Sequence, residues 1–154
     1  MKKKIEILAP AKDLIQGIAA INAGADAVYI GAPLYGARSN ATNSIEDVAE
    51  LVKYAHLFNA QVFVVINTIL YDNELESCRQ MIWKLYHIGV DALIIQDMAI
   101  MEMELPPIVL HASTQANNRD ADKIKFLADA GMKRVVLARE LNLHQIKEIS
   151  EASD

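Results

Sequence analysis

The sequence predicts an α/β fold with a parallel sheet, arranged as a TIM-barrel-like (β/α) domain in which about six of the eight βα units are present. The first observation is a repeated pattern: a short apolar run ends in polar residues and leads into an amphipathic segment. The second is a set of related phrases that introduce these runs, AGADAVYIG at 23–31, IGVDALIIQ at 88–96 and AGMKRVVLA at 130–138. The third is the almost continuous apolar character of runs such as VFVVI, which is typical of strands covered on both faces.

The first half of the chain alternates strands with helices. We expect strands at 5–9, 27–31 and 61–67, and helices at 11–23 and 44–58. Asp13 lies in the first turn of the first helix, where a carboxylate interacts favourably with the helix dipole. Gly24 follows that helix and can adopt the left-handed conformation that turns the chain into the next strand. Ser44 and Asp47 have the spacing of a capping box at the start of the second helix.

The second half continues the alternation. We expect helices at 72–88, 98–104, 117–130 and 143–152, and strands at 92–96, 108–112 and 134–139. Apolar residues recur at helical spacing in the first of these helices and would face the sheet: Leu75, Cys78, Ile82, Leu85, Tyr86 and Ile88. Gly89 and Gly131 follow helices, as Gly24 does. Pro106 and Pro107 end the short helix before the fifth strand.

Polar strand ends favour a barrel over an open doubly wound sheet. In an open sheet the site gathers at one switch point, so few strand ends need be polar. Here the third to sixth strands all end in hydrogen-bonding groups, which a ring of strand ends around one mouth explains better. A complete barrel has about eight units and ~250 residues. We therefore expect residues 1–154 to be the N-terminal part of a single barrel domain, truncated before its last units, and we expect its open edge strands to favour self-association.

Composition limits the functional classes. The 154 residues are 53% hydrophobic and 23% charged, with a net charge of −5, which argues against a large basic nucleic-acid footprint on this segment. No apolar run reaches the ~18 residues that cross a bilayer. Glu6 and Pro10 interrupt any signal peptide, so we expect a cytoplasmic protein with no membrane partner. The single cysteine, Cys78, excludes an internal disulfide and cannot alone hold a metal cluster, so we predict no metal site.

The densest polar group is HASTQANN at 111–118. His111 lies at a predicted strand end, where it could be a general acid or base, a ligand or a hydrogen-bonding anchor. The alternative is a histidine of the barrel interior that is bonded to a backbone carbonyl. Ser113 and Gln115 lead into the next helix, whose exposed amides could hold an anion. Helix capping by Ser113 is the alternative there.

Arg139 and Glu140 end the sixth strand in the phrase VVLARE. Consecutive strand side chains point to opposite faces, so we expect only one of the two to enter the mouth readily. Arg139 suits a carboxylate or phosphate, and an ion pair with Asp97 or Glu140 is the alternative. Asn67 and Gln96 present neutral amides that suit a polar ring or an amide.

The loop at about 32–43 is long for a βα loop and is a candidate binding loop. Tyr35 and Arg38 offer stacking and charge there, and a solvated loop is the alternative. Asp97 either joins the site or caps the following helix. We predict that the catalytic residues are His111, Arg139 and Glu140. We predict that the substrate-binding residues are Tyr35, Arg38, Asn67, Gln96, Asp97, Ser113 and Gln115.

Several familiar motifs are absent from the sequence. It contains no GxGxxG, GxxxxGK[ST], HExxH or paired-cysteine motif. Dinucleotide-binding, P-loop and zinc-protease functions therefore receive little support.

The chain resembles the opening half of the peptidase U32 family, also called collagenase-like proteases, over nearly its whole length. The phrases that carry the resemblance are EILAPAKDLIQGIAAINAGADAVYIGAPLYGAR, VFVVINTILYDNEL, LYHIGVDALIIQD, LHASTQANN and RVVLARELNLHQI. The residues in recurrent family phrases are Asn67, Gln96, Asp97, His111, Ser113, Gln115, Arg139 and Glu140. The chain departs from the family at Lys12, where glycine is common.

The resemblance implies a barrel at the start of a longer protein. The family name implies proteolysis, whereas several branches act in hydroxylation of tRNA or ribosomal RNA, linked to prephenate, or of ubiquinone. Those branches carry an iron–sulfur cluster, whose cysteines we expect beyond Asp154, because Cys78 matches no such motif. RNA base hydroxylation by the full-length enzyme is the first hypothesis, a collagenase-like peptidase the second, and a non-catalytic barrel half that serves assembly the third. We expect the segment alone to be inactive.

Overall fold

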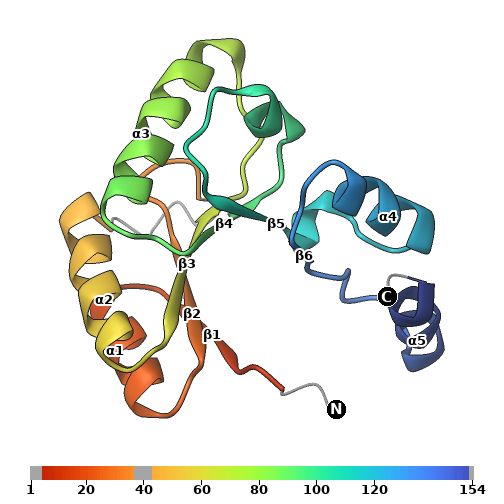
Figure 1. Ribbon diagram of the computed structural model, residues 1–154, viewed down its shortest axis with the longest axis horizontal. Coiled ribbons are helices and arrows are strands. Elements are labelled where there is room, and N and C mark those ends of the chain that lie inside the picture. The colour runs from red at the N-terminus through yellow and green to blue at the C-terminus, as the bar shows by residue number, and fades with distance from the viewer. Residues whose placement is uncertain (1–4, 37–42, 153–154) are drawn as a thin grey trace.

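The computed structural model describes residues 5–36 and 43–152. Six parallel strands form one sheet in the order β1-β2-β3-β4-β5-β6, and the sheet curls into a half-barrel with its helices outside (Figure 1). The strands are β1 Leu8–Ala11, β2 Ala27–Gly31, β3 Gln61–Ile66, β4 Ala92–Ile95, β5 Val109–Ala112 and β6 Arg134–Val135. The α/β fold class and the parallel, sequential strand order expected from the sequence are confirmed.

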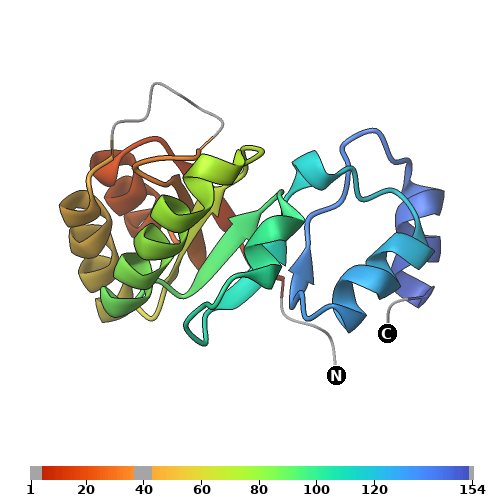
Figure 2. The same ribbon diagram turned by 90° about the horizontal axis from the view of Figure 1, so that it is seen from above.

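An α-helix follows every strand except β4. They are α1 Leu14–Asn22, α2 Ile45–Leu57, α3 Leu75–His87, α4 Ala121–Asp129 and α5 Leu143–Ala152. Three short 3₁₀ helices lie in the connections, η1 Asp72–Glu74, η2 Met98–Glu102 and η3 Thr114–Ala116. Helices α1, α2 and α3 pack side by side in sequence order, and α4 packs beside α5 at the other end of the molecule (Figures 1 and 2).

The first strand and helix lie further along the chain than predicted. The first strand was expected at 5–9, but β1 begins at Leu8 because its ladder with β2 starts at the pair Leu8–Ala27. The first helix was expected from residue 11, but Asp13 is its N-cap and accepts from the Gln16 N–H at 2.9 Å. The capping box of α2 is confirmed, since Ser44 and Asp47 each bond the other's backbone.

Three later elements are shorter than predicted. The helix expected at 98–104 is the 3₁₀ helix η2. The helix expected at 117–130 begins only at Ala121, because Asn117 has a left-handed φ of 57° and breaks the segment. The strand expected at 134–139 pairs with β5 through Arg134 and Val135 alone.

The repeated phrases have a structural role at the amino ends of the strands. Asp26 and Asp91, from AGAD and IGVD, directly precede β2 and β4. The Asp26 carboxylate accepts from the Ile7 N–H at 2.9 Å, and the Asp91 carboxylate accepts from the Val62 N–H at 2.8 Å. Each aspartate thus ties its own strand to the preceding one. At the equivalent position of the third phrase, the Lys133 N–H donates to the Leu110 carbonyl at 2.9 Å.

Both faces of the sheet are covered by apolar packing, as the continuous apolar runs predict. The larger core lies between the sheet and the helices and includes Val28, Val64 and Leu93. The smaller lies on the concave face around Phe63 and Ile94. Residues alternate between these two cores along β2, β3 and β4.

Some apolar side chains of the outer helices are exposed. Phe126 of α4 is 65% exposed and Leu143 of α5 is 85% exposed. The expected self-association of the 154-residue chain through its open edge strands stays a prediction. Within the described ranges, no helix combines the length and apolar character needed to span a bilayer.

Candidate functional site

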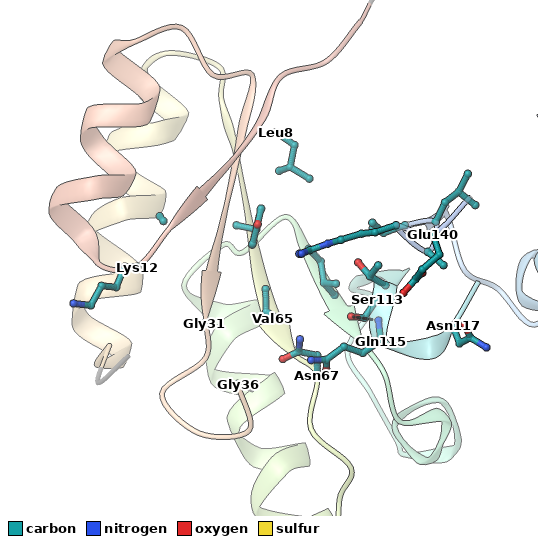
Figure 3. Close-up of a pocket in the computed structure, with 18 of the residues that line it drawn as sticks. Leu8, Lys12, Gly31, Gly36, Val65, Asn67, Ser113, Gln115, Asn117 and Glu140 are labelled. Carbon is teal, nitrogen blue, oxygen red and sulfur yellow. Dashed lines mark hydrogen bonds between the residues drawn. The ribbon is translucent and has the colours of Figure 1, made fainter. Parts of the chain in front are cut away.

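A cavity opens where the carboxyl ends of the strands meet. Its volume is about 1190 Å³, and Asn67, Ser113, Gln115, Arg139 and Glu140 line it. Ser113, Gln115 and Glu140 lie on one side and Lys12 and Gly31 on the opposite side (Figure 3). The structure thus brings half of the predicted site residues together. Their chemical roles stay predictions.

The first wall of the cavity follows β5. Ser113 continues the ladder, since its N–H donates to the Ile95 carbonyl at 2.7 Å. Its hydroxyl accepts from the Gln115 N–H at 3.2 Å and caps η3. The alternative prediction for Ser113, that it caps the following helix, is therefore confirmed. Gln115 is exposed, so its amide is available to a ligand.

The second wall follows β6. Arg139 and Glu140 both line the cavity, so the expectation that only one would readily enter the mouth was wrong. The reason is that β6 ends at Val135, and the strand alternation behind that expectation no longer applies at a turn. Glu140 lies 3.6 Å from Arg119. Arg139 has no ion-pair partner among residues 5–36 and 43–152.

His111 lies deeper than a strand end. It pairs with Ile94 in the β4–β5 ladder and is 5% exposed, and it is not among the residues that line the cavity. Its ring meets the Phe63 ring edge to face, with centroids 4.8 Å apart. Burial, reinforced by the charge of Arg134, lowers the pKa of His111 to about 4. The imidazole is therefore neutral near pH 7.

The alternative expectation for His111, a histidine of the barrel interior bonded to a backbone carbonyl, is correct in its first part only. The side chain does lie in the barrel interior, but its Nδ1 has no hydrogen-bond partner within the described part of the chain, so no carbonyl bond forms there. A buried polar atom in this state costs folding free energy.

Asp97 and Tyr35 are occupied by structural contacts. The Asp97 carboxylate accepts from the Ala99 N–H at 2.9 Å, which is the predicted capping alternative. It also accepts from the Leu70 N–H at 2.8 Å. The Tyr35 hydroxyl lies 2.5 Å from the Ser77 hydroxyl. Neither residue lines the cavity.

The remaining two predicted site residues are Gln96 and Arg38. Gln96 follows β4 and is half-buried, and it is not among the lining residues. Arg38 lies outside the described residues. Substrate binding by Gln96 and Arg38 stays a prediction.

Several residues of the site were not predicted from the sequence. Lys12, Gln16, Thr114 and Asn117 also line the cavity. The fully buried Asn118 supports the wall behind it. The phrase HASTQANN at 111–118 indicated that this stretch belongs to the site. The sequence does not show, however, which of its amide side chains are exposed and which are buried.

The described residues do not fit an iron–sulfur cluster or another metal. Cys78 is buried, and burial raises the pKa of its thiol to about 11, so it is not poised as a thiolate ligand. No group of three or more potential metal-ligating side chains occurs within the described ranges.

Taken together, the fold and site define a parallel βα half-barrel whose polar residues gather at the carboxyl edge of the sheet. The chain belongs to peptidase family U32, whose model matches residues 12–154. The predicted family membership is confirmed.

The chain is also similar in sequence to proteins that act in RNA hydroxylation. The chain is 56% identical over 151 residues to the 23S rRNA 5-hydroxycytidine C2501 synthase of Escherichia coli K12, covering 98% of this chain and 23% of that protein. It is 36% identical over 156 residues to tRNA hydroxylation protein P1 of Bacillus subtilis 168, covering 99% of this chain and 37% of that protein. The chain thus spans well under half the length of these relatives.

A solved structure shares the fold. The structure of the U32 peptidase Mk0906 aligns with a TM-score of 0.80 at 13% identity, over 100% of this chain and 67% of that one.

Proposed function

We propose that this chain supplies one wall of the active site of an RNA base hydroxylase. The observation that carries the proposal is the 56% identity to the 23S rRNA 5-hydroxycytidine synthase, which extends over 98% of the chain. In this proposal residues 1–154 are the N-terminal part of one barrel domain, and the whole enzyme works in the cytoplasm. The isolated segment is inactive.

The chemistry of the cavity suits a nucleotide. Enzymes that modify a base must take it out of the stack and hold it in a pocket. A cavity of about 1190 Å³ is large enough for a nucleoside. The amides of Asn67 and Gln115 can each donate to and accept from the polar edge of a pyrimidine. Arg139, without an ion-pair partner in the described ranges, can bind a phosphate through its planar fork.

The acidic net charge of −5 limits this role to the pocket. Neutralising the backbone of a long RNA requires clustered basic residues. In this proposal the rest of the protein therefore supplies most of the RNA affinity. It also supplies the cysteines of any iron–sulfur cluster, because Cys78 is unsuited to that role.

The family name favours a second candidate, a collagenase-like peptidase. The residues present give it little chemical support. Ser113 uses its hydroxyl to cap η3, and His111 packs against Phe63. No hydrogen bond joins Ser113 to a histidine within the described ranges, so a nucleophile and base are not assembled here.

The test uses the full-length gene in a strain that lacks it. Mass spectrometry of 23S rRNA and tRNA would measure base hydroxylation after complementation. We expect the wild type to restore it. We expect Arg139→Ala to reduce it roughly tenfold or more, since a charge-assisted hydrogen bond is worth about 1.5–3 kcal/mol.

Arg79→Ala is the matched control, because Arg79 pairs with Glu76 on the surface of α3, away from the cavity. It should restore hydroxylation as well as the wild type. Unchanged RNA in the deletion strain, together with peptide cleavage by the purified full-length protein, would overturn the proposal in favour of the peptidase.

A further inference from the structure

The second wall of the cavity is held by very few backbone contacts. The β5–β6 ladder contains only the pairs His111–Arg134 and Ala112–Val135. Arg139 and Glu140 lie beyond this ladder, at a turn. One further backbone bond, from the Val136 N–H to the Ala112 carbonyl at 3.0 Å, extends it. Further hydrogen bonds are therefore needed to hold the segment that carries Arg139.

Asn118 forms hydrogen bonds to both walls. Its side-chain amide donates to the Ser113 carbonyl at 2.9 Å and to the Val136 carbonyl at 2.8 Å. Its own backbone carbonyl accepts from the Ala138 N–H at 3.0 Å. A single residue thus bonds the loop after β5 once and the segment after β6 twice.

The chemistry of these contacts requires asparagine. The side-chain NH₂ has two donors on a short stem, and both are used on buried carbonyls. Aspartate has the same size but no donors, and its charge would repel both carbonyls. Asn118 is 0% exposed, and its Oδ1 has no partner within the described part of the chain. An apolar residue would leave the Ser113 and Val136 carbonyls without these donors, so the two bonds that the amide makes offset the cost of its unpartnered Oδ1.

The same device occurs at the other side of the half-barrel. Asn43 is 5% exposed, and its amide donates to the Lys12 carbonyl at 3.1 Å and the Gly31 carbonyl at 3.2 Å. Those carbonyls follow β1 and end β2. Each asparagine lies just before a helix, α2 or α4, and joins the ends of two neighbouring strands.

We propose that Asn118 is a positioning residue, which fixes the distance between the two walls of the cavity. One wall carries Ser113 and Gln115, and the other carries Arg139 and Glu140. Asn118 acts through these residues and does not line the cavity itself. The effect on activity rests on the proposed function, whereas the effect on the segment at 136–140 does not.

Amide hydrogen exchange of the full-length protein tests the placement directly. Asn118→Asp should speed exchange in residues 136–140 by about tenfold, because the buried hydrogen bond to the Val136 carbonyl is lost. Asn43→Asp is the matched comparison, and it should speed exchange near residues 12 and 31 while leaving 136–140 unchanged. Unchanged exchange at 136–140 in Asn118→Asp would overturn the proposal.

Base hydroxylation in the complemented strain gives the second readout, at equal protein abundance. Asn118→Asp should lower it about tenfold. Ser44→Ala, which removes the cap of α2 and does not alter a cavity-lining residue, controls for general destabilisation and should retain hydroxylation. Full hydroxylation by Asn118→Asp would overturn the positioning role. If the wild type itself restores no hydroxylation, the proposed function fails, and the exchange result alone decides the role of Asn118.

Discussion

His111 is a buried base that is held neutral by its surroundings. It is 5% exposed, and its Nδ1 has no hydrogen-bond partner within the described ranges. The guanidinium of Arg134 lies over the Phe63 ring, 5.4 Å from its centroid, and the same ring packs against His111. Protonation of His111 would therefore place a second positive charge in a poorly hydrated site beside Arg134. His111 is therefore unprotonated at neutral pH and is not suited to act as a general acid there.

The lowered pKa of His111 predicts a loss of stability in acid. Its value in the folded chain is about 4, against an ordinary value of 6.5. Between these values the unfolded chain binds more protons, so the free energy of unfolding falls as the pH drops from about 6.5 to about 4. We expect this group alone to contribute a loss of roughly 3 kcal/mol. Urea unfolding at a series of pH values from neutral to acid would measure it.

His111→Gln is the control for this prediction, because glutamine is polar and does not titrate. The carboxylates of Glu6, Asp47 and Glu76, whose pKa values are all lowered, are common to both proteins. The difference between the two pH profiles therefore isolates His111. Parallel profiles would show that its pKa is not lowered.

At the scale of the elements, strand order was readable from the sequence because each apolar run is followed by an amphipathic segment. The ends of the elements were not, because tertiary partners decide them. β1 starts where β2 offers a partner, at Leu8, and β6 stops at Val135 although VVLA is apolar. The cavity walls were predictable from polar strand ends. The depth of His111 was not, since strand alternation gives the face of a residue but not its height in the barrel.

Gly17 of α1 offers a test of helix packing. A Cβ at this position would lie 2.6 Å from Cδ1 of Leu51, which is fully buried in α2. Alanine is normally favoured over glycine in a helix by about 1 kcal/mol. Here we expect Gly17→Ala to destabilise the protein by ~1–2 kcal/mol, because the overpacking cost exceeds that gain. Chemical denaturation would measure the change.

Leu51→Ala provides the control for the steric argument. Alone it should cost about 3 kcal/mol through the cavity that it leaves. Combined with Gly17→Ala it should cost less than the sum of the two, because the added methyl then has room. A Gly17→Ala variant at least as stable as the wild type would contradict the packing seen between α1 and α2.

Across the whole molecule, one ion pair joins the two ends of the half-barrel. Arg134 of β6 donates to both carboxylate oxygens of Glu6, at 2.7 and 2.8 Å, although the residues are 128 positions apart in the chain. The hydrogen bond from Arg134 lowers the pKa of Glu6. The side chains are 39% and 34% exposed, so solvent screens the pair and its energy is modest.

A double-mutant cycle with Glu6→Gln and Arg134→Gln would measure this link. We expect a coupling free energy of about 0.5–1 kcal/mol, which high salt reduces. The pair Lys147–Glu151 on α5, at 3.7 Å and largely exposed, is the comparison and should couple more weakly. Arg134→Gln should also raise the pKa of His111, followed by NMR, because the charge of Arg134 helps to lower it. Zero coupling together with an unmoved His111 titration would mean that Arg134 does not reach across the concave face in solution.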